Sequence, residues 1–231
     1  MPAYMSQIYL SLCQVSDAAN PALPQLYEML TQEKRAKADR FVAPKARRLF
    51  LVAHVLLQQA LCRAGVERPH QFADGRYGKP YLPDHPHIQF NLSHKDGLVA
   101  VAIARDHEIG VDVENRVVSR DIDQLSARVF TDAERAEVAS SADPAGHFTQ
   151  LWTAKEAVMK ATGYGFHLPS QQIAFTRKAS ALSSLPAEHG PIAAWWVHTE
   201  RLDAHWLALA ARHHFKRIDR VFLNCATELL E

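Results

Sequence analysis

Two stretches of this chain, LVAVAIAR at residues 98–105 and WLALAAR at residues 206–212, resemble each other and decide the fold that the sequence predicts. Each is an apolar run of strand length, and each comes after a segment whose apolar residues recur at helical spacing, residues 49–61 and about 147–162. A helix followed by strands therefore occurs twice. We expect an α+β fold of two similar α/β halves related by a pseudo-twofold axis, because such units bury their apolar faces against each other.

Further elements can be placed around these stretches. Residues 23–64 predict two helices, the second of which ends at Gly65. Strands are predicted at residues 88–93, 98–104 and 109–114, then at 194–197, 206–211 and 220–223. Residues 121–140 predict a helix and the start of another, with Thr131 and Glu134 as a capping box. We divide the chain into an N-terminal half, residues 1–108, and a C-terminal half, residues 109–231.

Composition excludes several classes of protein. Lys and Arg number 26 against 25 Asp and Glu, so nothing indicates a nucleic-acid-binding surface. Cys13, Cys62 and Cys225 are too few and too far apart for a disulfide framework or a CxxC zinc site. No basic residue precedes Lys34, and no apolar run approaches the roughly 20 residues of a membrane span. We therefore expect a cytoplasmic protein with neither a signal peptide nor a membrane segment.

The third predicted strand, IGVDVE at residues 109–114, carries two carboxylates. Because side chains alternate along a strand, Asp112 and Glu114 project from one face, and Gly110 on that face leaves room for a ligand to approach. Such a pair of oxygen ligands suits a hard cation. The alternative is the polar outer face of a half-exposed strand.

The helix near residues 151–160, LWTAKEAVMK, brings a third carboxylate. Trp152, Glu156 and Lys160 are spaced at i, i+4 and i+8 and therefore share one face. The alternative is an ordinary Glu–Lys pair on a solvated face, with Trp152 in the core. Together, three carboxylates and a lysine predict a site for Mg²⁺ and phosphate groups.

Five motifs, taken in order, resemble the 4′-phosphopantetheinyl transferase superfamily. They are YGKP at 77–80, NLSH at 91–94, GVDVE at 110–114, FTDAE at 130–134 and WTAKEAVMK at 152–160. The likeness is to the larger, pseudodimeric branch typified by the activator of surfactin synthetase. It implies an active site in the cleft between the halves. It also implies transfer of the 4′-phosphopantetheine group of coenzyme A, the co-substrate, to a serine of an apo carrier protein, giving holo carrier protein and 3′,5′-ADP.

The resemblance also implies roles for individual residues. It gives Mg²⁺ three ligands, Asp112, Glu114 and Glu156, and it makes Lys160 the residue that neutralises charge on the phosphates. The general base is left open between Glu156, Glu134 and a water at the metal. The implied contacts to coenzyme A are Lys34, Lys37 and Arg48 at the 3′-phosphate, and Lys79, Ser93, His94, Asp112 and Lys160 near the nucleotide and the phosphates. The segment at residues 47–49 departs from the surfactin-type pattern, because it is one residue shorter and has Leu49 in place of a hydroxyl residue.

The acceptor stays open among acyl, polyketide and peptidyl carrier proteins. We expect a monomer, because two halves in one chain would supply what two subunits supply in the smaller branch of the superfamily. Two other functions use the same residues: a Mg²⁺-dependent nucleotide phosphohydrolase, and a non-catalytic module that binds coenzyme A or a carrier protein.

Overall fold

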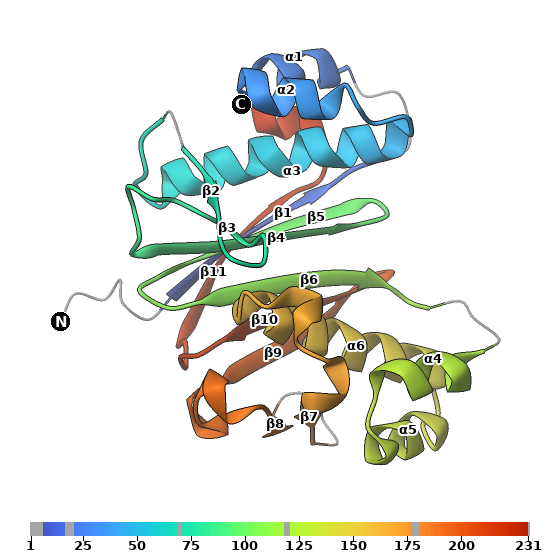
Figure 1. The fold of residues 1–231 in the computed structure, drawn as a ribbon. Coiled ribbons are helices and arrows are strands. Elements are labelled where there is room, and N and C mark those ends of the chain that lie inside the picture. Colours follow the sequence, from blue (N-terminus) through green and yellow to red (C-terminus); the bar gives the residue numbers. More distant parts are fainter. Residues whose placement is uncertain (1–6, 17–20, 69–70, 118–120, 177–180, 231) are drawn as a thin grey trace.

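The two halves of the molecule each consist of a sheet covered on its outer side by helices (Figure 1). The computed structural model describes residues 7–16, 21–68, 71–117, 121–176 and 181–230. The two sheets face each other at the middle of the molecule, and the long helices α3 (Pro44–Arg63) and α6 (Pro144–Ala161) lie on opposite outer sides. The α+β fold of two similar halves is thus confirmed.

The first sheet has the strand order β11-β1-β5-β4. Its strands are β1 (Gln7–Gln14), β4 (Ile88–Lys95), β5 (Leu98–Arg105) and β11 (Arg217–Leu223). Strand β1 pairs parallel with β11 and antiparallel with β5, which pairs antiparallel with β4. Helices α1 (Leu23–Glu28), α2 (Gln32–Ala38) and α3 lie on this half, together with η6 (Ala226–Leu230) and the small pair β2 (Ala73–Asp74) and β3 (Pro80–Tyr81).

The second sheet is antiparallel, with the order β6-β10-β9. Its strands are β6 (Ile109–Asn115), β9 (Trp196–Leu202) and β10 (His205–Ala211). Helix α6 packs on its outer face, and α4 (Ile122–Val129) and α5 (Asp132–Ala139) pack on α6. Short elements complete this half: η2 (Gly165–His167), η3 (Ser170–Gln172), β7 (Ala174–Phe175), β8 (Leu182–Ser184), η4 (Ala187–His189) and η5 (Ile192–Ala194).

The alanine-rich strands β5 and β10 are buried on both faces. The valines and isoleucine of β5 (Val99, Val101 and Ile103) belong to the core under α3, whereas Ala100 and Ala102 belong to the core between the two sheets. Strand β10 is also buried on both faces but reverses the sizes, with Ala208 and Ala210 under α6 and Leu207 and Leu209 between the sheets. The two similar stretches of sequence are therefore the central strands of the two halves, where one face packs on a helix and the other on a sheet.

The two halves exchange strands along the chain. Strand β6 follows β5 but joins the second sheet, and β11 follows β10 but joins the first. The division after residue 108 falls directly before β6. The last strand and η6, which we had placed with the C-terminal half, pack against β1 and α3 of the other half.

Local predictions hold at several helix ends. Gly65 and Gly163 follow α3 and α6 with φ of +84° and +73°, a conformation that glycine adopts without strain. Thr131 and Glu134 form the predicted capping box at the start of α5. Residues 23–64 contain three helices instead of two, because the Thr31 side chain caps a separate helix α2. Within the described residues, no helix combines the length and the apolar character that crossing a bilayer requires.

Candidate functional site

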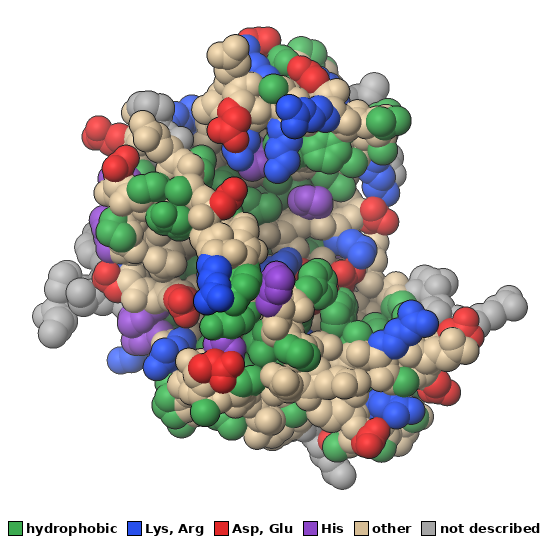
Figure 2. All heavy atoms as spheres, in the orientation of Figure 1, with side chains coloured by type: hydrophobic (Ala, Val, Ile, Leu, Met, Phe, Trp, Pro, Cys, Tyr) green, Lys and Arg blue, Asp and Glu red, His purple; other side chains and the backbone are tan. Residues whose placement is uncertain are grey.

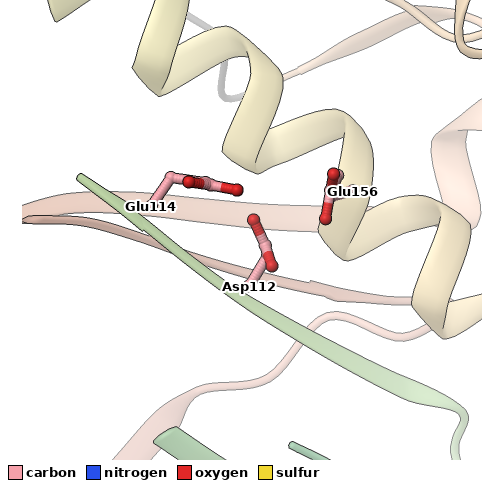
Figure 3. A group of neighbouring side chains, drawn as sticks. All are labelled: Asp112, Glu114 and Glu156. Atoms are coloured by element: carbon pink, nitrogen blue, oxygen red, sulfur yellow. The ribbon is translucent and has the colours of Figure 1, made fainter. Parts of the chain in front are cut away.

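Three carboxylates from two elements point toward one another at the junction of β6 and α6 (Figure 3). Asp112 and Glu114 come from β6 and Glu156 from α6, and one oxygen of each lies within 4.8 Å of the others. The structure thus brings together the three residues that the sequence predicted as metal ligands.

The close approach of α6 to β6 depends on Gly110. A Cβ atom at this position would lie 2.0 Å from the Ala157 carbonyl oxygen and 2.5 Å from the Ala161 nitrogen. Any larger residue would push the helix, and with it Glu156, away from Asp112 two residues further along the strand. Gly110 therefore makes room for the helix and not, as we expected, for a ligand.

Asp112 is buried, with 2% of its side chain exposed, so the alternative of a half-exposed outer face is wrong for this residue. Its Oδ1 accepts hydrogen bonds from Ser93 Oγ at 2.9 Å and from Lys160 Nζ at 2.6 Å. Its Oδ2 is buried without a hydrogen-bond partner among the described residues. A buried carboxylate oxygen in that state is destabilising, and a cation would supply the missing partner.

Burial and mutual repulsion favour protonation of the two glutamates. Desolvation raises the pKa of Glu156 to about 7, and the charges of Asp112 and Glu114 act in the same direction, against Lys160. The pKa of Glu114 is also raised, mainly by desolvation, although Lys95 opposes the shift through a 2.7 Å ion pair. Three carboxylates this close repel one another, and a divalent cation between them would remove the repulsion.

The predicted face of α6 lies along this site. Trp152, Glu156 and Lys160 are all half-buried, and Lys160 pairs with Asp112 on the neighbouring strand, so it is not simply half of a surface Glu–Lys pair. Trp152 lines a groove of about 400 Å³ that begins at Glu114. The groove surface is mostly apolar, with Leu125, Val129 and Phe148, and the basic residues Lys95, Arg116 and Arg128 also line it.

A second group of basic side chains lies on the first half. The predicted Lys34 and Lys37 both come from α2, and a hollow of about 590 Å³ is lined by Lys34, His54, Arg68 and Phe72. Figure 2 shows histidine and Lys or Arg side chains around the recess where the halves meet. His54 was missed by the sequence analysis. Its pKa is lowered to about 3 by burial and by the charges of Lys34 and Lys37, with a smaller contribution from His94.

The other predicted contacts to coenzyme A have mixed surroundings. His94 is exposed on β4, and loss of solvation and the charge of Lys160 lower its pKa. Arg48 is half-buried in the second turn of α3, and the neighbouring Leu49 belongs to the core, which explains its apolar character. Lys79 donates from Nζ to the carbonyl oxygens of Ile109 at 3.1 Å and Ala161 at 3.0 Å. It therefore joins the loop at residues 75–80 to both elements of the carboxylate site.

Glu134 does not join the group of three carboxylates. Its Oε2 pairs with Lys155 Nζ at 2.6 Å and accepts from the backbone nitrogen of Thr131, while Oε1 accepts from the backbone nitrogen of Phe175. Both residues of the ion pair are buried, with 2% of Glu134 and 0% of Lys155 exposed. Lys155 also donates to the carbonyl oxygens of Val129 and Ser170, so these contacts tie α6 to its neighbours. Nothing in the sequence pattern distinguished this buried pair from surface charges.

Comparison with known proteins gives matches over most of the chain. A family model described as "4′-phosphopantetheinyl transferase superfamily" matches residues 108–210, and one described as "4′-phosphopantetheinyl transferase, N-terminal" matches residues 18–106. The chain is 34% identical over 181 residues to 4′-phosphopantetheinyl transferase HetI of Nostoc sp. (strain PCC 7120), covering 74% of this chain and 76% of the relative. It is 29% identical over 204 residues to 4′-phosphopantetheinyl transferase Sfp of Bacillus subtilis (strain 168), covering 80% and 88%. The corresponding values for 4′-phosphopantetheinyl transferase psf-1 of Bacillus pumilus are 30% over 203 residues, covering 84% of each chain.

Proposed function

The chain belongs to the 4′-phosphopantetheinyl transferase superfamily, and we propose that Asp112, Glu114 and Glu156 form the centre at which it performs that reaction. The enzyme transfers the 4′-phosphopantetheine group of coenzyme A to a serine of a carrier protein. The observation that supports this centre best is the buried, unpartnered Oδ2 of Asp112 within a group of three carboxylates. Neither a phosphohydrolase nor a non-catalytic binding module is favoured, because the relatives are transferases.

The three carboxylates fit Mg²⁺, which takes oxygen ligands and leaves positions for substrate oxygens. We propose Asp112, Glu114 and Glu156 as its protein ligands. When bound, the ion would neutralise charge on the pyrophosphate of coenzyme A and polarise its oxygens. Any other cation at this site would also have to bind the buried, unpartnered Oδ2 of Asp112.

Lysine side chains would bind coenzyme A from both sides of the recess. Lys160 stands 2.6 Å from Asp112 and is 27% exposed, so its ammonium can stabilise charge that develops on the phosphates. Lys34 and Lys37 on α2 would supply positive charge for the 3′-phosphate at the other side. We add His54 as a neutral hydrogen-bonding group beside them, since its pKa is lowered to about 3 by burial and by both lysines, and it lines the same hollow as Lys34.

Glu156 is the proposed general base. Its pKa is raised to about 7 in the ion-free protein, and a bound cation would lower that pKa, so Glu156 would accept the proton on the oxygen that does not bind the ion. It would take the proton of the carrier serine directly or through one water. The serine oxygen then attacks the β-phosphorus, the bond to the α-phosphate oxygen breaks, and 3′,5′-ADP leaves. We leave Glu134 out of this step because both of its oxygens are already hydrogen-bonded in a buried ion pair.

Transfer to purified carriers tests the proposal. The protein is incubated with coenzyme A, Mg²⁺ and apo forms of an acyl, a polyketide and a peptidyl carrier protein, and intact mass is recorded. We expect at least one carrier to gain the mass of one phosphopantetheine group and to lose that gain when its serine is changed to alanine. Modification of the acyl carrier would establish holo-[acyl-carrier-protein] synthase activity. A folded protein that modifies none of the three would contradict the proposal.

A further inference from the structure

The hydroxyl group of Ser93 has no hydrogen-bonding capacity left for a substrate. Ser93 Oγ donates to Asp112 Oδ1 at 2.9 Å, and it accepts from Lys160 Nζ at 3.0 Å and from the backbone nitrogen of Val113 at 3.3 Å. A serine hydroxyl has one donor and two acceptor positions, so these three contacts use all of them. Only 6% of Ser93 is exposed. A phosphate oxygen could bind here only by displacing one of these contacts.

We propose that Ser93 is a positioning residue that determines which oxygen of Asp112 meets the divalent cation. The inference rests on the proposed function of the carboxylate site. Ser93 and Lys160 both bind Oδ1, so that oxygen is occupied, while Oδ2 is buried and without a partner in the described residues. Rotation of the carboxylate would break two charge-assisted contacts on Oδ1. On this proposal, Ser93 keeps Oδ1 occupied and leaves Oδ2 as the oxygen that is available to the ion.

A consequence is selectivity among divalent cations. Mg²⁺ is small and requires nearly ideal octahedral geometry, whereas Ca²⁺ accepts carboxylates that bind through both oxygens. An Asp112 held by Ser93 can offer one oxygen only. The hydroxyl of Ser93 should therefore favour Mg²⁺, and its removal should favour the larger ion.

Ser93 is also held in place by hydrogen bonds between the edge strands β4 and β6. Strands β4 and β6 lie at the facing edges of their sheets, and two side chains of β4 bind backbone nitrogens of β6. Asn91 Oδ1 accepts from the nitrogen of Val111 at 2.9 Å, and Ser93 Oγ accepts from that of Val113 at 3.3 Å. Asn91 thus supplies the same link between the halves as Ser93, two residues away from the carboxylate contact. It provides a matched control.

The test measures cation binding directly. Purified wild type, Ser93→Ala, Ser93→Thr and Asn91→Ala are titrated with MnCl₂ without coenzyme A, free Mn²⁺ is followed by electron paramagnetic resonance, and MgCl₂ or CaCl₂ is added as competitor. We expect Ser93→Ala to weaken Mg²⁺ binding about 10- to 100-fold, the usual effect of losing a group that orients a metal ligand. The ratio of Ca²⁺ to Mg²⁺ affinity should rise. Ser93→Thr should restore Mg²⁺ binding, and Asn91→Ala should leave it within about twofold of wild type.

Binding of 3′,5′-ADP in EDTA, measured by calorimetry, separates the two roles open to Ser93. We expect Ser93→Ala to bind it as tightly as wild type. Weaker binding of 3′,5′-ADP with unchanged Mg²⁺ affinity would overturn the inference and make Ser93 a phosphate ligand. Equal loss of Mg²⁺ binding in Asn91→Ala would also overturn it, because the link between the strands would then be responsible. A wild type that binds Mg²⁺ but modifies no carrier would instead contradict the proposed function.

Discussion

Among single residues, Asp112 has more contacts within the site than Glu114 or Glu156. It is the one of the three carboxylates that is buried, and it contacts both Ser93 and Lys160. Its negative charge stabilises the ammonium of Lys160 and at the same time raises the pKa of Glu156. Removing that charge should therefore affect catalysis more than folding.

Asp112→Asn tests this balance. The amide keeps the size of the side chain but offers no charge to a cation, so we expect the rate of carrier modification to fall about 10²- to 10³-fold. The loss of attraction to Lys160 is offset by relief of repulsion from Glu114 and Glu156, so the melting temperature without metal should change little. Rates come from intact mass of the carrier and stability from thermal unfolding. A rate within tenfold of wild type would rule out Asp112 as an essential ligand.

The raised pKa values of Glu156 and Glu114 predict how pH changes the stability of the ion-free protein. A carboxylate whose folded pKa exceeds its unfolded value binds more protons when folded, so stability falls as pH rises between about 4.5 and 7. Mg²⁺ should reverse that loss. Adding Mg²⁺ should raise the melting temperature more at pH 7.5 than at pH 5.5. We expect the difference between the two rises to be about 2–4 °C, which corresponds to about 1 kcal/mol of additional stabilisation. Equal rises at both pH values would contradict the assignment of these carboxylates.

At the scale of elements, α6 is fixed to the rest of the second half by the buried pair of Lys155 and Glu134. The three donors of Lys155 Nζ go to Glu134 and to the carbonyl oxygens of Val129 and Ser170. Glu156 is the next residue of the helix. The pair therefore fixes the rotation of α6 that turns Glu156 toward β6.

Glu134→Gln distinguishes this structural role from a catalytic one. The change leaves Lys155 as a buried charge without its counterion, which we expect to destabilise the protein by about 3–5 kcal/mol. Urea unfolding measures the loss, and a double variant with Lys155→Met should recover part of it. Carrier modification by the folded fraction at low temperature should stay within about tenfold of wild type, below the usual contribution of a general base. Unchanged stability with activity abolished would make Glu134 the base.

The elements also show which features the sequence could predict. The alternation in β6 and the spacing in α6 are local patterns, and they placed Asp112, Glu114, Glu156 and Lys160 correctly on shared faces. The strand β1, in the middle of the first sheet, was not predicted, because its position depends on pairing with the distant β5 and β11. The contact of Ser93 with Asp112 was not predicted either, since it joins strands of two different sheets.

At the scale of the whole molecule, the exchange of β6 and β11 makes the two halves depend on each other. Strand β6 directly follows the β4–β5 hairpin of the first sheet but belongs to the second sheet. Strand β11 directly follows the β9–β10 hairpin of the second sheet but belongs to the first. Asp112 and Glu114 lie on β6, the first exchanged strand, and η6, which follows the second exchanged strand, packs against α3. In this arrangement a single chain supplies both halves, and the monomer expected from the sequence stays a prediction.

Lys79 provides a measure of the contact between the halves. The half-buried side chain donates from Nζ to the carbonyl oxygens of Ile109 and Ala161, and desolvation lowers its pKa to about 8. A lysine whose folded pKa lies below its unfolded value binds fewer protons when folded. Its contribution to stability is therefore unfavourable below pH 8 and improves as pH rises from 8 toward 10.5. Wild type should gain stability relative to Lys79→Met between pH 7.5 and 9.5 in urea unfolding. Lys79→Arg does not titrate in this range, so it should show no such gain. If the difference in unfolding free energy between wild type and Lys79→Met stayed constant with pH, the desolvation of a charged Lys79 between the halves would be contradicted.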